Sequence, residues 1–339
     1  MARLDRRTRE LLRGLEASVS SAFVEAIRDI PGLSDLKVFR EALEARDLER
    51  AMRIIGPTDA NFQRLDDAIR EAYTAGGEGA IRNLSGIRDP QTGAIVRPTF
   101  DRRTANAVRW VQREAGSAIQ GLNASITQVV REVLSEGIAE GASARGMVTR
   151  LMGTYNRATK QREGGVLGLT REQFRASENM AAKLSAGDYR SYFDYKLRNR
   201  RFDDMVERAM LSGDPLSPVD IRNIQQGYEG NMLTARGNSV AREEASKAYN
   251  AGRHESFTQV RDGGLVSNDQ FRRTWRSNDD DRSRATHADQ DGVEVIGLDT
   301  PHTLSDGTQL MYPKDDSLGA DAEHTMGCRC FEEITIVRS

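Results

Sequence analysis

Residues 275–330 read WRSNDDDRSRATHADQDGVEVIGLDTPHTLSDGTQLMYPKDDSLGADAEHTMGCRC. This segment holds both cysteines of the chain, three of its four histidines and one of its two tryptophans. It is rich in Gly, Asp and Pro and has no long apolar run, so it cannot form an amphipathic helix. We expect a compact, loop-rich unit with short strands, held together by something other than a large apolar core.

The chain before this segment has the apolar spacing of helices, because Leu, Ile, Val and Ala recur at three-to-four-residue intervals. The spacing predicts helices over residues 3–30, 35–54, 59–75, 100–139, 189–211, 218–233 and 236–261. Two further helices are expected to begin after the capping residues Ser143 and Thr170. Gly76 and Gly77 are expected to loosen the chain, and residues 85–98 predict a turn-rich linker or an exposed hairpin.

The predicted fold class is therefore mainly α, with long helices in an extended or bundle-like N-terminal part and a small loop-rich α+β domain at the C-terminus. We expect an N-terminal helical region at 1–98, a long-helix region with a helical lead-in at 99–262, and the C-terminal domain at 263–339. The helix over 100–139 either spans a bundle or pairs with another chain, which allows a homo-oligomer through long helices.

Charge and composition exclude several classes of protein. The formal net charge is −2 over 339 residues, so the chain has no overall positive charge that would indicate nucleic-acid binding. The first residues carry charges throughout and lack the apolar region of a secretory signal, and no segment approaches the roughly 18 apolar residues that span a bilayer. Two cysteines spaced C-x-C do not make a disulfide framework, which indicates synthesis in a reducing cytoplasm.

A metal site is one interpretation of the C-terminal histidines and cysteines. The candidate ligands are His287, His324, Cys328 and Cys330, and zinc is the metal that thiolate and imidazole groups favour. The C-x-C spacing is less usual for zinc than C-x2-C. The alternative is that both thiols are small, reduced, semi-buried residues beside the terminal strand. The run at 279–281 is expected to be a solvated acidic turn.

A basic cluster formed by Arg198, Arg200 and Arg201 is a candidate nucleic-acid contact. On a helix surface such a cluster is more often solvated or paired with neighbouring acids, here Asp203 and Asp204. Enzyme signatures are absent from the sequence: it has no G-x-x-x-x-G-K-[ST], no G-x-G-x-x-G after a strand, no G-x-S-x-G and no H-E-x-x-H.

The order of short motifs in the C-terminal part resembles the phage minor head protein family, the Mu F-like head morphogenesis domain. The matching residues are Trp275, Arg284 with His287, Asp291-Gly292, Gly307 through Leu310, Tyr312-Pro313 to Asp315, and Cys328-Arg329-Cys330. Upstream, residues 240–244 stand where the family often has I-A-R-T-E. Arg242 and Glu244 are therefore counted among the residues that match the family motifs. The resemblance covers roughly residues 137–337, and Gly327 stands where the family usually has Asn.

The resemblance implies a role in virion assembly rather than catalysis. It implies a low-copy component of the capsid interior or portal vertex, made in the host cytoplasm, that assists head assembly, DNA packaging or DNA ejection. The implied partners are the portal protein, the major capsid protein or both, and packaged DNA, with no membrane. It also favours Arg242 and Glu244 as a buried pair against a module fixed by Trp275, His287 and the two cysteines.

Two other functions remain open from the sequence. A His/Cys/Asp cluster is compatible with a metal-dependent hydrolase, a nuclease or a toxin-like enzyme. A DNA-binding ejection protein is the third interpretation, and its binding would weaken steeply with salt.

Overall fold

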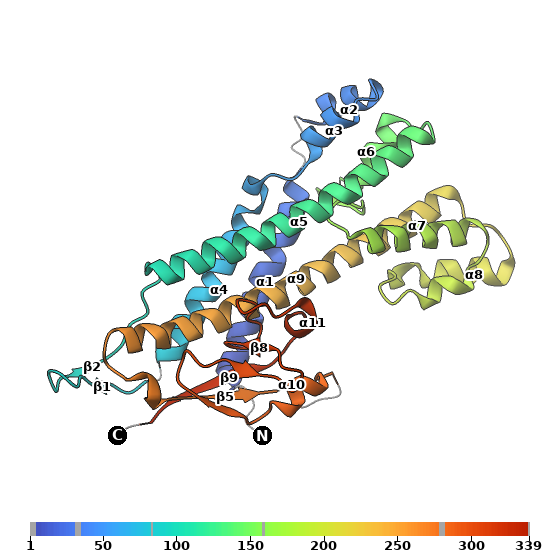
Figure 1. Ribbon diagram of the computed structural model, residues 1–339. Coiled ribbons are helices and arrows are strands. Elements are labelled where there is room, and N and C mark those ends of the chain that lie inside the picture. Colours follow the sequence, from blue (N-terminus) through green and yellow to red (C-terminus); the bar gives the residue numbers. More distant parts are fainter. Residues whose placement is uncertain (1–4, 31–34, 83, 158–159, 278–281, 338–339) are drawn as a thin grey trace. The chain divides into compact units, whose positions relative to one another are not determined.

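The computed structural model describes residues 5–30, 35–82, 84–157, 160–277 and 282–337 (Figure 1). It is mainly helical, with small sheets of two or three strands, which confirms the predicted fold class. The helices are α1 (Arg6–Asp29), α2 (Asp35–Glu44), α3 (Leu48–Ile55), α4 (Gln63–Arg82), α5 (Ala105–Ala139), α6 (Ala144–Met152), α7 (Arg171–Ser185), α8 (Asp203–Ser212), α9 (Pro218–Asp262), α10 (Ala285–Asp289) and α11 (Ala322–Thr325). None of the described helices is long and apolar enough to cross a bilayer.

The strands are short, and most of them form hairpins. They are β1 (Ile87–Arg88), β2 (Ile95–Val96), β3 (Thr154–Asn156), β4 (Gln161–Glu163), β5 (Phe271–Arg276), β6 (Glu294–Ile296), β7 (His302–Thr303), β8 (Gln309–Leu310) and β9 (Phe331–Ile336). The antiparallel pair β1–β2 is the hairpin expected over residues 85–98.

The chain divides into two compact units, each made of separate stretches. Unit 1 contains Met1–Ser20, Leu65–Ser117 and Ser239–Ser339, and unit 2 contains Ser21–Arg64 and Ala118–Asn238. Helices α1, α5 and α9 contribute residues to both units. The predicted division of the chain at residues 98 and 262 remains a prediction.

Unit 2 contains a buried carboxylate on α9. Glu229 is 1% exposed and accepts hydrogen bonds from the Gly165 backbone N–H and the Ser177 hydroxyl, both at 2.7 Å, while Arg150 forms an ion pair with it. Because a buried charge is costly unless it is paired and hydrogen-bonded, these partners fix α9 against α6 and α7.

Unit 1 contains the three-stranded antiparallel sheet β6-β5-β9. The central strand β5 alternates between buried and half-buried positions, and Phe271, Arg273 and Trp275 form its buried face. Phe271 packs with Phe257 of α9 in one apolar cluster. Trp275 belongs to a second, smaller cluster that also contains Leu304, Leu310, Cys328 and Cys330.

Two predicted helices are broken in the structure. The helix expected over 35–54 stops at Glu44 and restarts at Leu48, because Arg46 has a φ of 55° and Asp47 caps α3 by accepting the Arg50 N–H at 2.9 Å. The helix expected over 189–211 is regular only from Asp203 to Ser212. Residues before it form short 3-10 turns, η2 (Arg190–Asp194) and η3 (Arg200–Phe202).

Two segments that were predicted as separate helices form one continuous helix in the structure. The segments expected over 218–233 and 236–261 join in α9, a 45-residue helix. Gly237 in its interior costs about 1 kcal/mol relative to Ala, which tertiary packing outweighs. The neighbouring Arg236 is buried and donates to the Gly168 carbonyl and the Ser125 hydroxyl. Hydrogen bonds to other segments of unit 2 therefore stabilise this part of the helix.

The predicted break at Gly76 and Gly77 is also wrong, since α4 continues to Arg82. A Cβ at Gly76 would lie 2.1 Å from the Tyr249 carbonyl oxygen of α9, and a Cβ at Gly252 would lie 1.9 Å from the Tyr73 carbonyl oxygen of α4. These glycines therefore let the backbones of α4 and α9 touch where they cross, rather than ending a helix.

We predict that Gly76→Ala destabilises unit 1 by about 2 kcal/mol or more, because the methyl group meets backbone that cannot move aside. Gly79→Ala on the same helix is the matched control. Its Cβ would meet nothing closer than 3.6 Å, and we expect a gain of about 0.5–1 kcal/mol from helix propensity. Urea unfolding of both variants checks this, and equal effects would contradict the close crossing.

Candidate functional site

The structure brings three of the four candidate metal ligands together. The Nδ1 atom of His287 lies 3.5 Å from the Sγ atoms of both Cys328 and Cys330, and the three ligand atoms lie within 4.8 Å of one another. All three side chains are buried, with 1%, 4% and 8% of their surface exposed. Helix α10 supplies the histidine, and the turn before β9 supplies the cysteines.

Protonation of the two thiols is coupled. The Cys330 thiol, with help from His287, lowers the pKa of Cys328 well below its usual range, although burial opposes the shift. The same contact with Cys328, together with burial, raises the pKa of Cys330. The two shifts have opposite signs, so Cys328 loses its proton more readily than Cys330.

His324, the fourth candidate, lies beside this group but outside it. Its ring is stacked on that of His287, with centroids 5.9 Å apart and an interplanar angle of 13°. Its Nε2 atom lies 3.1 Å from Oδ2 of Asp306 and 3.3 Å from the Thr308 hydroxyl. Its Nδ1 atom is buried and has no hydrogen-bond partner among the described residues.

A buried ion pair joins the strands to the loops of the same region. Arg273 of β5 is fully buried and donates from Nε to Glu332 of β9 at 3.1 Å. Its other nitrogens donate to the carbonyls of Leu298, Thr300 and Met311 at 2.8–2.9 Å. One guanidinium thus holds β5, β9 and the connection from β6 to β8 in register.

Glu332 has a second partner in His302, whose Nε2 lies 2.8 Å from Oε1. Burial tends to raise the pKa of Glu332, but the contacts with His302 and Arg273 outweigh it and hold the pKa below its usual value. His302 therefore belongs to the carboxylate network.

The recognised motifs converge on Glu243 of α9. Its carboxylate pairs with the buried Lys314 and accepts the Gly327 backbone N–H at 2.5 Å. Lys314 belongs to the Tyr-Pro-x-Asp motif, and Gly327 directly precedes Cys328. The helix preceding the module thereby contacts two of its loops through one side chain.

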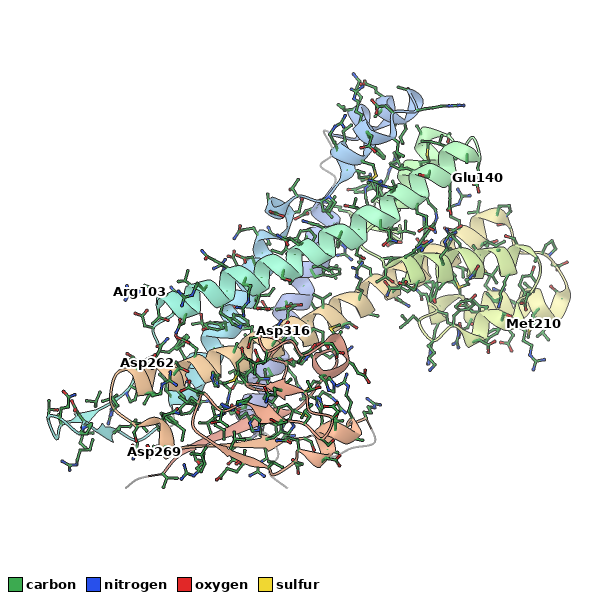
Figure 2. The ribbon with its side chains drawn as sticks, in the orientation of Figure 1. Arg103, Glu140, Met210, Asp262, Asp269 and Asp316 are labelled. Carbon is green, nitrogen blue, oxygen red and sulfur yellow. The ribbon has the colours of Figure 1, made fainter. Side chains whose placement is uncertain are left out.

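One face of α9 carries further polar contacts of this kind. Lys247 pairs with Asp316 and Glu114, both at 2.6 Å, and Figure 2 labels Asp316 beside the helix. Asn250 donates to the Pro313 carbonyl at 3.1 Å. Residues 243, 247 and 250 share a helix face, because they are spaced four and three apart.

The expected Arg242–Glu244 pair is not formed. Arg242 is exposed, and its Nη2 donates to the Ser239 hydroxyl at 3.4 Å. Glu244 is half-buried, and burial raises its pKa to about 7, although Lys247 and Lys314 oppose the shift. Glu243, which lies between Arg242 and Glu244 in the sequence, makes the contact to the module instead. Polar side chains repeating every three to four residues were the signal that could have identified Glu243.

The other motif residues have structural roles. Arg284 donates to the Met326 carbonyl, Asp291 accepts the Ser277 N–H at 2.7 Å, and Gly292 has a φ of 79° and donates to the Trp275 carbonyl. Arg329 is exposed. The acidic run at 279–281 lies outside the described residues.

The basic cluster is divided between two environments. Arg198 is bonded to both carboxylate oxygens of Asp203 at 3.1 Å and lies over the Phe193 ring. Arg200 and Arg201 are exposed. Arg198 is therefore paired with a neighbouring acid, which is the alternative interpretation of the basic cluster. Nucleic-acid contact by this cluster remains a prediction.

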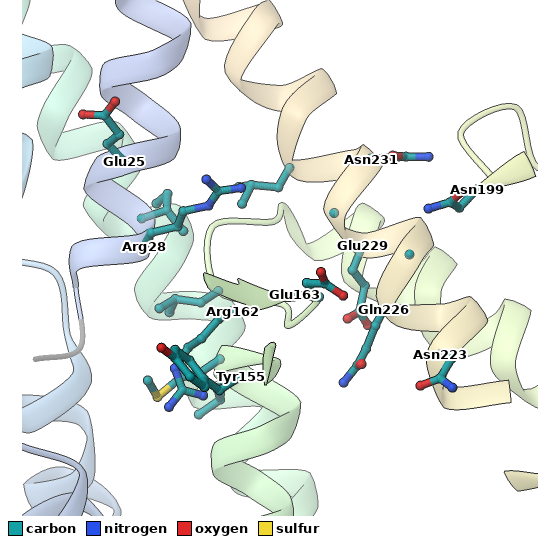
Figure 3. Close-up of a pocket in the computed structure, with 18 of the residues that line it drawn as sticks. Glu25, Arg28, Tyr155, Arg162, Glu163, Asn199, Asn223, Gln226, Glu229 and Asn231 are labelled. Atoms are coloured by element: carbon teal, nitrogen blue, oxygen red, sulfur yellow. The ribbon is translucent and has the colours of Figure 1, made fainter. Parts of the chain in front are cut away.

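A cleft of about 790 Å³ in unit 2 lies beside Arg201 (Figure 3). Its charged lining mixes both signs: Arg28, Arg64, Lys160, Arg162, Arg201, Glu25, Asp29, Glu163 and Glu229. Because cations and carboxylates alternate around it, the cleft does not present the basic surface that a nucleic-acid backbone requires.

We predict that Arg273→Met destabilises unit 1 by roughly 3–5 kcal/mol, because Glu332 is left buried without its cation. Arg276→Met on the same strand is the control. Its partner Glu333 is 45% exposed, so we expect a loss below about 1 kcal/mol. Denaturant unfolding distinguishes the two. Similar losses would show that the buried network does not hold the sheet.

A second prediction concerns pH. A carboxyl whose pKa is higher in the folded than in the unfolded state weakens folding as pH rises from 4.5 through 7. Glu244→Gln removes that cost, so we expect about 2 kcal/mol of stabilisation at pH 8 and none at pH 4.5. Urea unfolding at both pH values measures it, with the exposed Glu78→Gln as control. A gain independent of pH would refute the burial of Glu244.

Comparisons with known proteins identify the region that contains these contacts. Residues 200–332 match the family model described as Phage Mu protein F like protein, which spans less than half of the 339 residues. Neither the curated proteins nor the solved structures gave a match. The match extends from η3 through α9 and the sheet to the start of β9. Residues 200–332 of the chain are therefore similar to the Mu F-like phage head family.

Proposed function

We propose that this protein is a minor component of a phage head that associates with the portal vertex or the inner capsid surface. There it assists head assembly, DNA packaging or DNA ejection. The match of residues 200–332 to the Mu F-like family carries this proposal. The portal protein and the major capsid protein are the partners that we propose first, and packaged DNA is the third.

The contacts of α9 support an assembly role. Glu243, Lys247 and Asn250 anchor the C-terminal module to the helix through an ion pair, charged hydrogen bonds and a backbone contact. A module fixed in this way can serve as a rigid attachment point, because its orientation on the helix is set by directional bonds.

The geometry does not favour the enzyme alternative. A hydrolytic metal site keeps one coordination position open to water and substrate. The side chains of His287, Cys328 and Cys330 are at most 8% exposed, so the cluster offers a substrate little access. The mixed charge of the unit 2 cleft likewise does not favour DNA binding as the main function.

The test is incorporation into particles. We expect quantitative mass spectrometry of purified heads to find a few copies of the protein per particle, with cross-links to the portal or capsid protein. Lys314→Met leaves Glu243 without its cation and should cost roughly 3 kcal/mol, which reduces incorporation.

Arg103→Met is the control variant, because Arg103 forms only an exposed pair with Asp101 and is labelled at the start of α5 in Figure 2. It should be incorporated like the wild type. Absence of the wild-type protein from purified heads would exclude the proposed function, whereas normal incorporation of Lys314→Met would exclude only the role of the anchored module.

A further inference from the structure

The His287–Cys328–Cys330 cluster is buried, and none of the roles above uses it. Both thiol sulfurs lie 3.5 Å from the same imidazole nitrogen, Nδ1 of His287. The arrangement brings together three groups whose common property is metal ligation.

The separations suit a tetrahedral ion. Zinc binds thiolate sulfur at about 2.3 Å and imidazole nitrogen at about 2.1 Å, so two such ligands at a tetrahedral angle lie about 3.6 Å apart. Both nitrogen–sulfur distances are 3.5 Å. Two edges of a coordination tetrahedron are therefore already present, and the two sulfur atoms lie within 4.8 Å of each other.

His324 is the candidate for the fourth corner, although it lies outside the three ligand atoms that are within 4.8 Å of one another. Its ring is stacked beside that of His287, and its buried Nδ1 atom has no partner in the described part of the chain. Its Nε2 atom is held by Asp306 at 3.1 Å. A carboxylate on the far nitrogen is the usual support of a metal-bound histidine, since it fixes the ring and increases its basicity.

The surroundings explain what a metal would contribute. Among the described residues, the apolar cluster at this end of the module has five buried members: Trp275, Leu304, Leu310, Cys328 and Cys330. So small a core supplies little stability by itself, and small units of this kind commonly add a metal or disulfides. The four side chains come from α10, α11 and the segment before β9, so one ion would link three segments of the module.

We propose that His287, Cys328, Cys330 and His324 bind one zinc ion, which fastens α10 and α11 to the base of β9. Two thiolates and two imidazoles form a closed set of ligands that leaves no position for water, so the site is structural rather than hydrolytic. The proposal is independent of the partner that the protein has in the head.

The test begins with the full chain, stripped of metal by a chelator under reducing conditions and titrated with Co²⁺. We expect one equivalent to bind, with the thiolate-to-cobalt charge-transfer absorption and the visible d–d bands of a tetrahedral site. Zn²⁺ should displace the cobalt and raise the melting temperature. Absence of the charge-transfer band, or a melting temperature that zinc does not change, would overturn the proposal.

Variants assign the ligands. Cys330→Ser should abolish most of the charge-transfer absorption and weaken cobalt binding at least tenfold. His324→Gln should weaken binding while keeping the thiolate band, and unchanged affinity would remove His324 from the ligand set. Leu310→Ala is the matched control within the same apolar cluster: it should lower the melting temperature with and without zinc yet still bind one equivalent.

Discussion

The buried guanidinium of Arg273 is the interaction on which the C-terminal module most depends. A charge without access to water must satisfy its N–H groups locally, and four partners do so: Glu332 and the carbonyls of Leu298, Thr300 and Met311. The three carbonyl partners belong to loop segments that have little regular secondary structure, and the hydrogen bonds hold these segments in place. The module therefore gains from directional polar bonds the order that a larger domain gains from its apolar core.

The same physical logic attaches the module to α9. Glu243 contacts Lys314 and Gly327, Lys247 contacts Asp316, and the contacts lie on one helical face. Segments that are far apart in the sequence and that identify the Mu F-like family meet at this face. The similarity to that family covers residues 200–332, and these contacts give a structural reason why the helix and the module lie within one matched region.

The sequence predicts the regular parts of this protein well. Apolar spacing identified α1 and α5 and capping residues located α6 and α7, because both signals are local. It also brought His287, Cys328 and Cys330 together as candidates. It missed Arg273, although Phe271 and Trp275 are apolar and share its face of β5 by simple alternation. It placed the α9 contact on Glu244 instead of Glu243, since one residue along a helix turns a side chain by 100° and only tertiary contacts reveal which face is used.

The glycine crossing of α4 and α9 has a consequence for how this chain can change in length. The backbone of α4 at Tyr73 and Gly76 contacts the backbone of α9 at Tyr249 and Gly252. Neither helix can therefore gain or lose a residue without displacing this contact. Inserting or deleting one residue between the crossing and the polar face of α9 would rotate one set of contacts by 100° relative to the other. The hairpin at 85–98 carries no such requirement. Length variation in this part of the protein should therefore be confined to the hairpin, while the two helices keep their spacing.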